Sequence, residues 1–216
     1  MRVTPPKISD NLITVYDLDD YISKARKTDL PIENLLVKNV CVESEDMSYL
    51  TFTGVVFENC HFNSCDFEKT SFTDVKFSKC DLSSAEFNAS YFSRCEFYSS
   101  KLLGSIFSDV ILKEILLKSS AFSYGVFSRC SFSTAEFSVS DFSSTEFSEC
   151  KLKAMLLDHC KFCGTTFLNT KLGGMDFTKS ELSAIRISDP MRDLKNAIVT
   201  MSQATELSLL LGITIK

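Results

Sequence analysis

The sequence predicts an all-β solenoid built from square coils, and a single five-residue repeat carries this prediction. From position 52 to position 187, every fifth residue is Phe or Leu, with Ile187 as the one exception. All 19 Phe residues of the chain lie in this register. A column of mostly small residues precedes these central residues by two positions, and the other three positions hold nearly all the charged side chains.

A period of five fits neither an α-helix, which repeats about every 3.6 residues, nor an alternating strand, which repeats every two. Two inward residues per five, separated by two positions, describe a short extended segment followed by a corner. Four corners complete a coil of about 20 residues, and successive coils stack at a strand spacing of about 4.8 Å. A fixed period of this kind indicates a repeat architecture.

The pattern resembles the consensus of the pentapeptide-repeat family, which is a small residue, a polar residue, Leu or Phe, and two variable residues. The resemblance is carried by segments such as Cys60-His61-Phe62, Cys65-Asp66-Phe67, Cys80-Asp81-Leu82, Ala85-Glu86-Phe87 and Cys95-Glu96-Phe97. It implies a right-handed quadrilateral β-helix. It implies much less about function, because one fold hosts many functions.

We divide the chain into three parts. Residues 1–31 are expected to form a strand at 12–16 and a helix from Asp17 to Lys27, with Asp17 as N-cap, that covers the open end of the solenoid. Residues 32–188 form the β-helix, regular from residue 50, with an irregular segment from Ser44 to Ser48 where Glu45 would otherwise point inward. Its start between residues 32 and 50 stays open.

Residues 189–216 form a helical tail that we expect to mediate dimerisation. Thr200 and Gln203 have the spacing of a capping box, Gly212 is a helix stop, and residues 213–215 predict a terminal strand. This apolar tail folds back over the last coil or pairs with its copy in a second chain. The side chains expected to hold the dimer are Leu207, Leu210, Leu211, Ile213 and Ile215.

The tail is similar to that of the Qnr- and Mfp-type members of the family, through residues 194–200, Gln203-Ala204, Leu207 and residues 211–213. The resemblance implies a homodimeric rod that mimics DNA, binds a type II topoisomerase (DNA gyrase or topoisomerase IV) and protects it from quinolones at a low level. The uninterrupted repeat resembles the Mfp-type members more than the Qnr-type members whose coils carry projecting loops.

Composition argues against several other classes of function. A net charge of −5 argues against direct binding to nucleic acid, which needs a basic surface. The chain has no apolar run long enough to span a membrane and no secretory leader, so we expect a cytoplasmic protein. Seven of the nine Cys lie in the small column, where a thiol acts as a compact apolar group, so we expect no metal site and no cofactor.

An enzyme is the class that the sequence supports least. The two His residues, His61 and His159, lie on different faces and far apart along the predicted rod. Neither is placed for a catalytic triad, and no glycine-rich phosphate loop is present. We therefore assign no catalytic residue.

Unwinding the solenoid gives two neighbouring faces of opposite charge. The acidic face, centred on residues 67, 87, 107, 127, 147, 167 and 187, has a net charge of −3, and the basic face, centred on residues 52 to 172 in steps of 20, has a net charge of +3. We expect the acidic face to bind the topoisomerase, through Asp66, Glu68, Glu86, Asp109, Glu146 and Glu149.

An outward apolar belt supports a different function. The belt contains Ile106, Ile111, Leu116 and, farther along the same face as Leu116, Leu156. Exposed apolar patches often mark contacts. The alternative is therefore a pentapeptide-repeat interaction scaffold that is unrelated to topoisomerases and uses this belt or the basic face.

Overall fold

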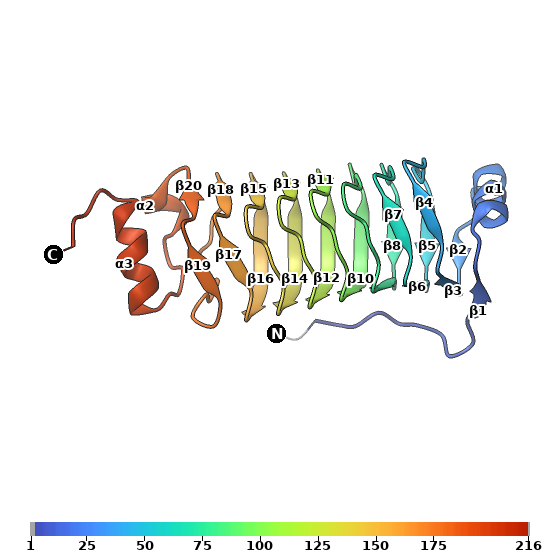
Figure 1. Ribbon diagram of the computed structural model, residues 1–216, viewed down its shortest axis with the longest axis horizontal. Coiled ribbons are helices and arrows are strands. Elements are labelled where there is room, and N and C mark those ends of the chain that lie inside the picture. The colour runs from blue at the N-terminus through green and yellow to red at the C-terminus, as the bar shows by residue number, and fades with distance from the viewer. Residues whose placement is uncertain (1–2, 216) are drawn as a thin grey trace.

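The computed structural model describes residues 3–215 and shows a rod of stacked coils with a helix at each end (Figure 1). Each coil takes 20 residues, since Phe52 pairs with Phe72 and Phe72 pairs with Phe92 in parallel ladders. The predicted all-β solenoid, a quadrilateral β-helix, is confirmed.

Parallel pairing between coils builds four faces. Two of them are the acidic and basic faces defined above. We name the remaining two the third face, centred on residues 57 to 177, and the fourth face, centred on residues 62 to 182. The largest sheet covers the basic and third faces with β1 (Ile13–Val15), β2 (Ile32–Glu33), β3 (Leu35–Lys38), β5 (Thr51–Thr53), β6 (Val56–Glu58), β8 (Ser71–Thr73), β9 (Lys76–Ser78), β10 (Tyr91–Tyr98), β12 (Ile111–Lys118), β14 (Ser131–Ser138) and β16 (Lys151–Asp158). The acidic face has β11 (Ile106–Ser108), β13 (Val126–Ser128), β15 (Glu146–Ser148), β18 (Thr166–Leu168) and β20 (Arg186–Ile187). The fourth face has β4 (Cys41–Glu43), β7 (His61–Asn63), β17 (Lys161–Cys163) and β19 (Glu181–Ser183).

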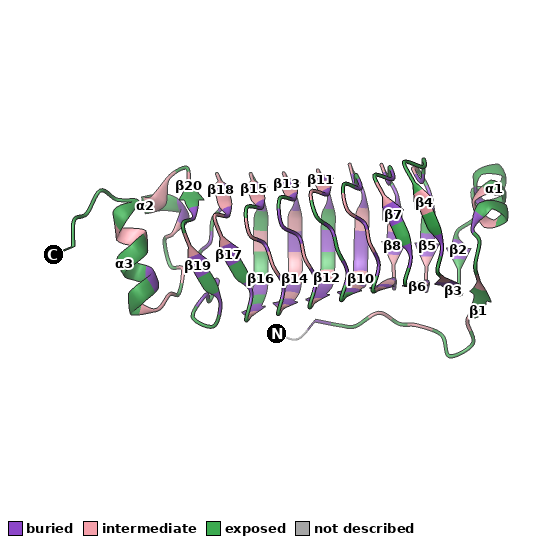
Figure 2. Ribbon diagram, in the orientation of Figure 1, coloured by how far each residue is buried: buried purple, intermediate pink, exposed green. Residues whose placement is uncertain are grey.

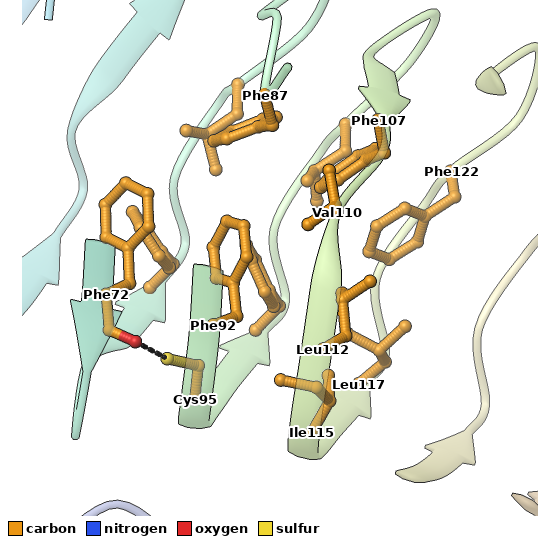
Figure 3. Close-up of a cluster of buried hydrophobic side chains, with 14 of the residues drawn as sticks. Phe72, Phe87, Phe92, Cys95, Phe107, Val110, Leu112, Ile115, Leu117 and Phe122 are labelled. Carbon is orange, nitrogen blue, oxygen red and sulfur yellow. Dashed lines mark hydrogen bonds between the residues drawn. The ribbon is translucent and has the colours of Figure 1, made fainter. Parts of the chain in front are cut away.

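The interior is filled by aromatic rings that stack from coil to coil. On the acidic face, six Phe rings from Phe67 to Phe167 form one column with centroids 4.6–5.4 Å apart. On the basic face, the rings of Phe72 and Phe92 are followed by Leu112, and the larger Val110 occupies the small column before it (Figure 3). Close packing of this kind leaves no room for a different register.

The small column fills little volume and satisfies backbone groups of the preceding coil. The thiol of Cys95 donates to the carbonyl oxygen of Phe72 at 3.4 Å (Figure 3), and the hydroxyl of Ser90 donates to that of Phe67 at 2.7 Å. Within residues 3–215, no buried side-chain nitrogen or oxygen lacks a hydrogen-bond partner. The column therefore links the coils through polar bonds as well as through packing.

Most corners of the coils lie at residues whose numbers end in 4 or 9, and these residues adopt positive φ angles. Glycine occupies a few of them, such as Gly54, but most hold ordinary residues, including Lys69 at 52° and Val139 at 50°. A β-branched residue in this region is strained. The stacking of the coils on either side must therefore outweigh this local cost.

The first coil begins at Ile32 and continues through the segment that we expected to be irregular. Asp46 pairs with Asp66 in the 20-residue register, and Met47 is buried, so the prediction of an irregular segment from Ser44 to Ser48 is wrong. The expected inward position of Glu45 is avoided, because its side chain is exposed at this end of the rod, where no coil is stacked before it.

Helices cover both ends, with boundaries that differ slightly from those predicted. α1 (Asp19–Thr28) begins after Leu18, and Asp17, the predicted N-cap, instead accepts a hydrogen bond from the Asp19 amide at 2.8 Å. Leu18 and Ala25 join the core at this end. At the other end, α2 (Pro190–Asp193) precedes α3 (Met201–Leu209), whose predicted capping box between Thr200 and Gln203 is present.

An N-terminal strap, residues 3–12, runs back along the rod (Figure 1). The amide of Lys7 donates to Asp74 Oδ1 at 2.9 Å, and the hydroxyl of Thr4 donates to Glu114 Oε1 at 3.0 Å. Three extended residues span about 10 Å, which matches the two coil spacings that separate Asp74 from Glu114. The strap therefore follows the corner between the basic and third faces.

Asp74 holds the strap from the side of the rod. Arg94 donates to its carboxylate through Nε and Nη2, both at 2.6 Å, in addition to the bond from Lys7. Burial raises the pKa of Asp74, but the hydrogen bonds from Arg94 and from the Lys7 amide together lower it below its usual value. The charged form is therefore favoured in the folded protein, and it contributes stability that is present above the unfolded pKa, near 3.8, and is lost as the pH falls through the lower folded pKa.

The substitution Asp74→Ala should release the strap. We expect a loss of about 2–3 kcal/mol of unfolding free energy, because Arg94 loses its buried partner and the Lys7 amide loses its acceptor. Tryptic cleavage at Lys7 should accelerate, and the wild type should lose the same stability only under strongly acidic conditions, where Asp74 becomes protonated. The matched control is Asp109→Ala, since Asp109 pairs with Arg129 in the same corner geometry but is exposed and touches no strap. Equal cleavage of both variants at Lys7 would show that Asp74 does not anchor the strap.

Candidate partner-binding surfaces

The predicted acidic residues share one face, but they do not form a continuous stripe. Asp46, Asp66 and Glu86 are neighbours in consecutive parallel bridges, so three carboxylates follow one another at intervals of about 4.8 Å. The next two positions of this column are apolar, Ile106 and Val126. The column thus has an N-terminal acidic patch, consisting of Asp46, Asp66, Glu68 and Glu86, and a C-terminal acidic patch, consisting of Glu146 and Glu149.

Internal pairing reduces the charge of part of this face. Asp109 accepts two hydrogen bonds from Arg129, at 2.8 and 2.7 Å, and these bonds lower the pKa of Asp109. Glu68 lies 3.0 Å from Lys69 Nζ. In the described chain, no Lys or Arg lies within 4.0 Å of the carboxylates of Asp66 or Glu86. These two side chains are therefore the most available anionic groups of the N-terminal acidic patch.

Glu146 and Glu149 also have no ion pair within the part of the chain that the structure describes.

Asp46 is an acidic residue of this face that the sequence-based prediction does not include, because residues 44–48 are expected there to be irregular. The signal was present, because Met47 continues the five-residue phase and Asp46 precedes it as Asp66 precedes Phe67. Asp46 differs from its neighbours in being paired with Arg26 of α1 at 3.2 Å.

The apolar belt is smaller than the sequence indicates. Leu116 is only 5% exposed and Val3 only 4%, and neither belongs to the core cluster. Since Thr4 is bonded to Glu114, the strap lies over Leu116, and the expectation that Leu116 is outward and exposed is wrong. Ile111 and Leu156 remain 45% and 43% exposed, and Ile106 is half-buried.

The tail packs one face of α3 on the last coil and leaves apolar side chains outside. Gln203 Nε2 donates to the carbonyl oxygens of Phe177 and Ser180 at 3.0 and 2.8 Å, which docks the helix. Leu207 is half-buried against the core. The exposed apolar residues of the tail include four predicted dimer contacts, Leu210, Leu211, Ile213 and Ile215.

Residues 213–215 do not form the predicted terminal strand. They pair with no strand within the described residues, because the coil end that could have received them is covered by α3 and by residues 193–198. Their exposed side chains are 50% (Ile213) and 53% (Ile215) accessible to solvent.

The thiols and imidazoles do not assemble into a reactive site in this structure. The seven Cys of the small column are buried, and burial raises the pKa of Cys95 to about 12, so this thiol is protonated at neutral pH. Cys41 is exposed and Cys163 is half-buried. Over residues 3–215, no group of three or more His, Cys, Asp or Glu side chains is arranged to hold a metal ion. None of the helices described there is long and apolar enough to cross a bilayer.

A filled β-solenoid with charged outer columns defines a repeat protein that presents an extended surface. The family described as pentapeptide repeat region matches residues 46–124, and the family described as pentapeptide repeats (8 copies) matches residues 145–184. This chain belongs to the pentapeptide-repeat family.

Solved structures of the same fold are similar to this chain at low sequence identity. A trypsin-treated variant of QnrB1, a plasmid-mediated fluoroquinolone resistance protein, has a TM-score of 0.53 and 19% identity, over 84% of this chain and 99% of that chain. HetL, a pentapeptide repeat protein involved in heterocyst differentiation regulation from the cyanobacterium Nostoc sp. strain PCC 7120, has a TM-score of 0.38 and 8% identity, over 85% of this chain and 95% of that chain. No curated protein matches the chain.

Proposed function

We propose that the protein is a non-catalytic, cytoplasmic binding rod whose acidic face occupies a cationic DNA-binding surface of a type II topoisomerase, DNA gyrase or topoisomerase IV, and gives low-level protection from quinolones. The observation that carries the proposal is that the carboxylates of Asp66 and Glu86, on consecutive coils, have no ion pair within the described residues. The likeness to QnrB1, described as a fluoroquinolone resistance protein, supports the choice of partner.

The proposed mechanism is competition for phosphate sites. A cationic groove that binds DNA attracts its phosphates electrostatically, and carboxylates placed along a rod can occupy the same groove by the same attraction. The coil spacing of about 4.8 Å differs from the rise of about 3.4 Å per nucleotide along one DNA strand, so the carboxylates match the groove by charge and not phosphate by phosphate. Because salt screens the attraction between exposed charges, this binding should weaken as salt is raised.

The split of the acidic face limits where this mimicry operates. The apolar Ile106 and Val126 separate the two patches by two coils, and Arg129 neutralises Asp109 between them. We assign the primary contact to the N-terminal acidic patch, because it has carboxylates on three consecutive coils. The C-terminal acidic patch serves as a secondary contact.

A homodimer is the second part of the proposal. The exposed apolar side chains of the tail, among them Leu210, Leu211 and Ile213, lie beyond the last coil, where a two-fold related copy can cover them. Pairing of two tails would extend the rod and place an acidic face on each half. The similarity of the tail to that of the Qnr- and Mfp-type proteins supports this arrangement.

An interaction scaffold with a partner other than a topoisomerase is the second candidate. Ile111 and Leu156 favour it, since both are more than two-fifths exposed on the outside of the rod. Leu116 is no longer part of this candidate surface, because the strap covers it.

The double substitution Asp66→Lys with Glu86→Lys tests the acidic face. We expect the wild-type protein to inhibit gyrase supercoiling or relieve quinolone-induced cleavage at micromolar concentration, more weakly at higher salt, and the double variant to be about tenfold less potent. Asp141→Lys with Glu181→Lys is the matched control, since both residues hold the same outward position on the fourth face. Equal potency of the two double variants, or no effect of the wild type at high excess, would refute the proposal.

The substitution Leu211→Arg tests the dimer. Sedimentation velocity should show a dimer for the wild type and a monomer for the variant, because a charge at a half-exposed apolar contact cannot be buried without a partner. Tyr124→Arg, a change at an exposed aromatic residue in the middle of the rod, should leave the dimer intact. A monomeric wild type would contradict the assignment.

A further inference from the structure

The large sheet ends at β16, although the chain continues for another coil beyond it. β10, β12 and β14 each pair with a strand on both sides. Residues 171–178 follow β16 by one coil but form no strand, and no ladder joins them to β16 in the described chain. The eight residues of β16 therefore form an open sheet edge inside the rod.

The hydrogen bonds between coils are interrupted at the same place. The amide of Lys151 donates to the carbonyl oxygen of Cys130 at 2.9 Å, as in earlier coils. One coil later, within residues 3–215, the amide of Lys171 makes no such bond to Cys150, and the amide of Ala154 finds no carbonyl in the following coil. Unpaired N–H and C=O groups along a strand are a template for another strand.

Burial changes at this edge as well. Leu152 is half-buried, whereas Leu112 and Phe132, which precede it in the same column, are 3% and 1% exposed. Leu156 is 43% exposed, and Figure 2 colours much of β16 as exposed. The edge thus offers apolar side chains together with free backbone groups.

The C-terminal tail pairs with residues 171–178 on the side that faces away from β16. Gly174 donates its amide to the carbonyl oxygen of Asn196 at 2.9 Å, and Leu172 donates to that of Asp193 at 2.8 Å, so the tail takes the place that the following coil has elsewhere in the rod. A Cβ atom on Gly173 would lie 2.7 Å from the carbonyl oxygen of Lys195, which shows how closely the tail backbone approaches. The tail holds this coil on its far side and leaves the near side open.

A cleft of about 1070 Å³ with a cationic lining lies between the first three residues of β16, residues 171–174 and the tail at residues 192–196. Its basic residues are Lys151, Lys153, Lys171, Arg192 and Lys195, and the lining has a single acid, Glu149. Arg192 is paired with Asp193 at 2.9 Å, but in the described chain no carboxylate lies within 4.0 Å of the four lysines. A protein with a net charge of −5 therefore has a concentrated positive site at this end of the rod.

We propose that this cleft binds an acidic peptide segment of a partner protein in an extended conformation, which adds as a strand to the edge of β16. Backbone groups of the peptide pair with those of β16, and its carboxylates meet the lysines that flank the cleft. Alternate side chains of a strand face opposite sides, so apolar residues between the carboxylates lie against Leu152. This site is separate from the acidic face, and its partner is independent of the topoisomerase.

Two other occupants fit less well. A nucleic acid strand would satisfy the lysines but not the unpaired N–H and C=O groups of the edge, which require a peptide backbone. The apolar end of a second copy, Ile213-Thr214-Ile215, has no carboxylate side chain to meet the lysines. An acidic peptide satisfies both features of the cleft.

Fluorescence anisotropy with a labelled peptide in which Glu alternates with Val tests the proposal on the full-length protein. The same peptide with Lys in place of Glu is the control ligand. We expect the acidic peptide to bind and Lys153→Glu and Lys171→Glu to weaken it by about tenfold or more each. Lys113→Glu is the matched control variant, since Lys113 occupies the same column as Lys153 two coils earlier, on a strand paired on both sides. It should leave the affinity unchanged.

Hydrogen exchange provides a readout that charge alone would not change. The amide of Ala154 should exchange rapidly in the free protein and become protected when the acidic peptide is added. Equal binding of the acidic and basic peptides, equal effects of Lys153→Glu and Lys113→Glu, or stronger competition by single-stranded DNA than by unlabelled peptide would overturn the proposal. Protection of Ala154 without peptide would also overturn it, because the edge would then be closed.

Discussion

The stacking of each coil directly on the preceding one is the interaction on which the rest of the structure depends. Phe columns such as that from Phe67 to Phe167 exist only because the central residue returns to the same place every 20 residues. Stacking also supplies the backbone hydrogen bonds that offset strained corners such as Val139. Each coil is thus stabilised mainly by its neighbours, as expected for a solenoid.

The same constraint decides where function can reside. The interior is filled with side chains, so chemistry is restricted to the three outward positions of each repeat and to the ends of the rod. Columns of like charge arise when one outward position keeps its character over successive coils, as from Asp46 to Glu86. Where stacking fails, at β16, the backbone groups that normally join the coils become a binding surface.

The five-residue register was sufficient to predict the solenoid, its four faces and the packing role of seven cysteines, because these features depend on local spacing. The capping box of α3 was predictable for the same reason, since Thr200 and Gln203 are three residues apart. The strap was not predictable, because the contact between Lys7 and Asp74 joins residues far apart in the chain and leaves no periodic signal. The burial of Leu116 follows from the strap and was missed with it.

The sequence allowed us to predict which charged residues lie on each face, but not how these charges are paired or interrupted. Two features depend on which outward residues become neighbours in successive coils. One is the ion pair between Asp109 and Arg129, and the other is the interruption of the acidic column at Ile106. The open edge of β16 arises at residues 171–178, which pair with the tail on one side and form no ladder with β16 on the other in the described chain. Gly173, where a Cβ atom would meet the carbonyl oxygen of Lys195, is the local trace of the contact with the tail.

Removal of one whole coil tests most directly the claim that coil stacking determines the structure. Deleting residues 121–140 joins Ser120 to Asp141 and keeps every later residue on its face, since these coils pair in a 20-residue register. We expect this variant to unfold cooperatively and to form a rod shorter by about 4.8 Å in small-angle scattering. Deleting residues 121–141, one residue more, breaks the register and should abolish cooperative unfolding. Equal stability of the two deletions would contradict the account.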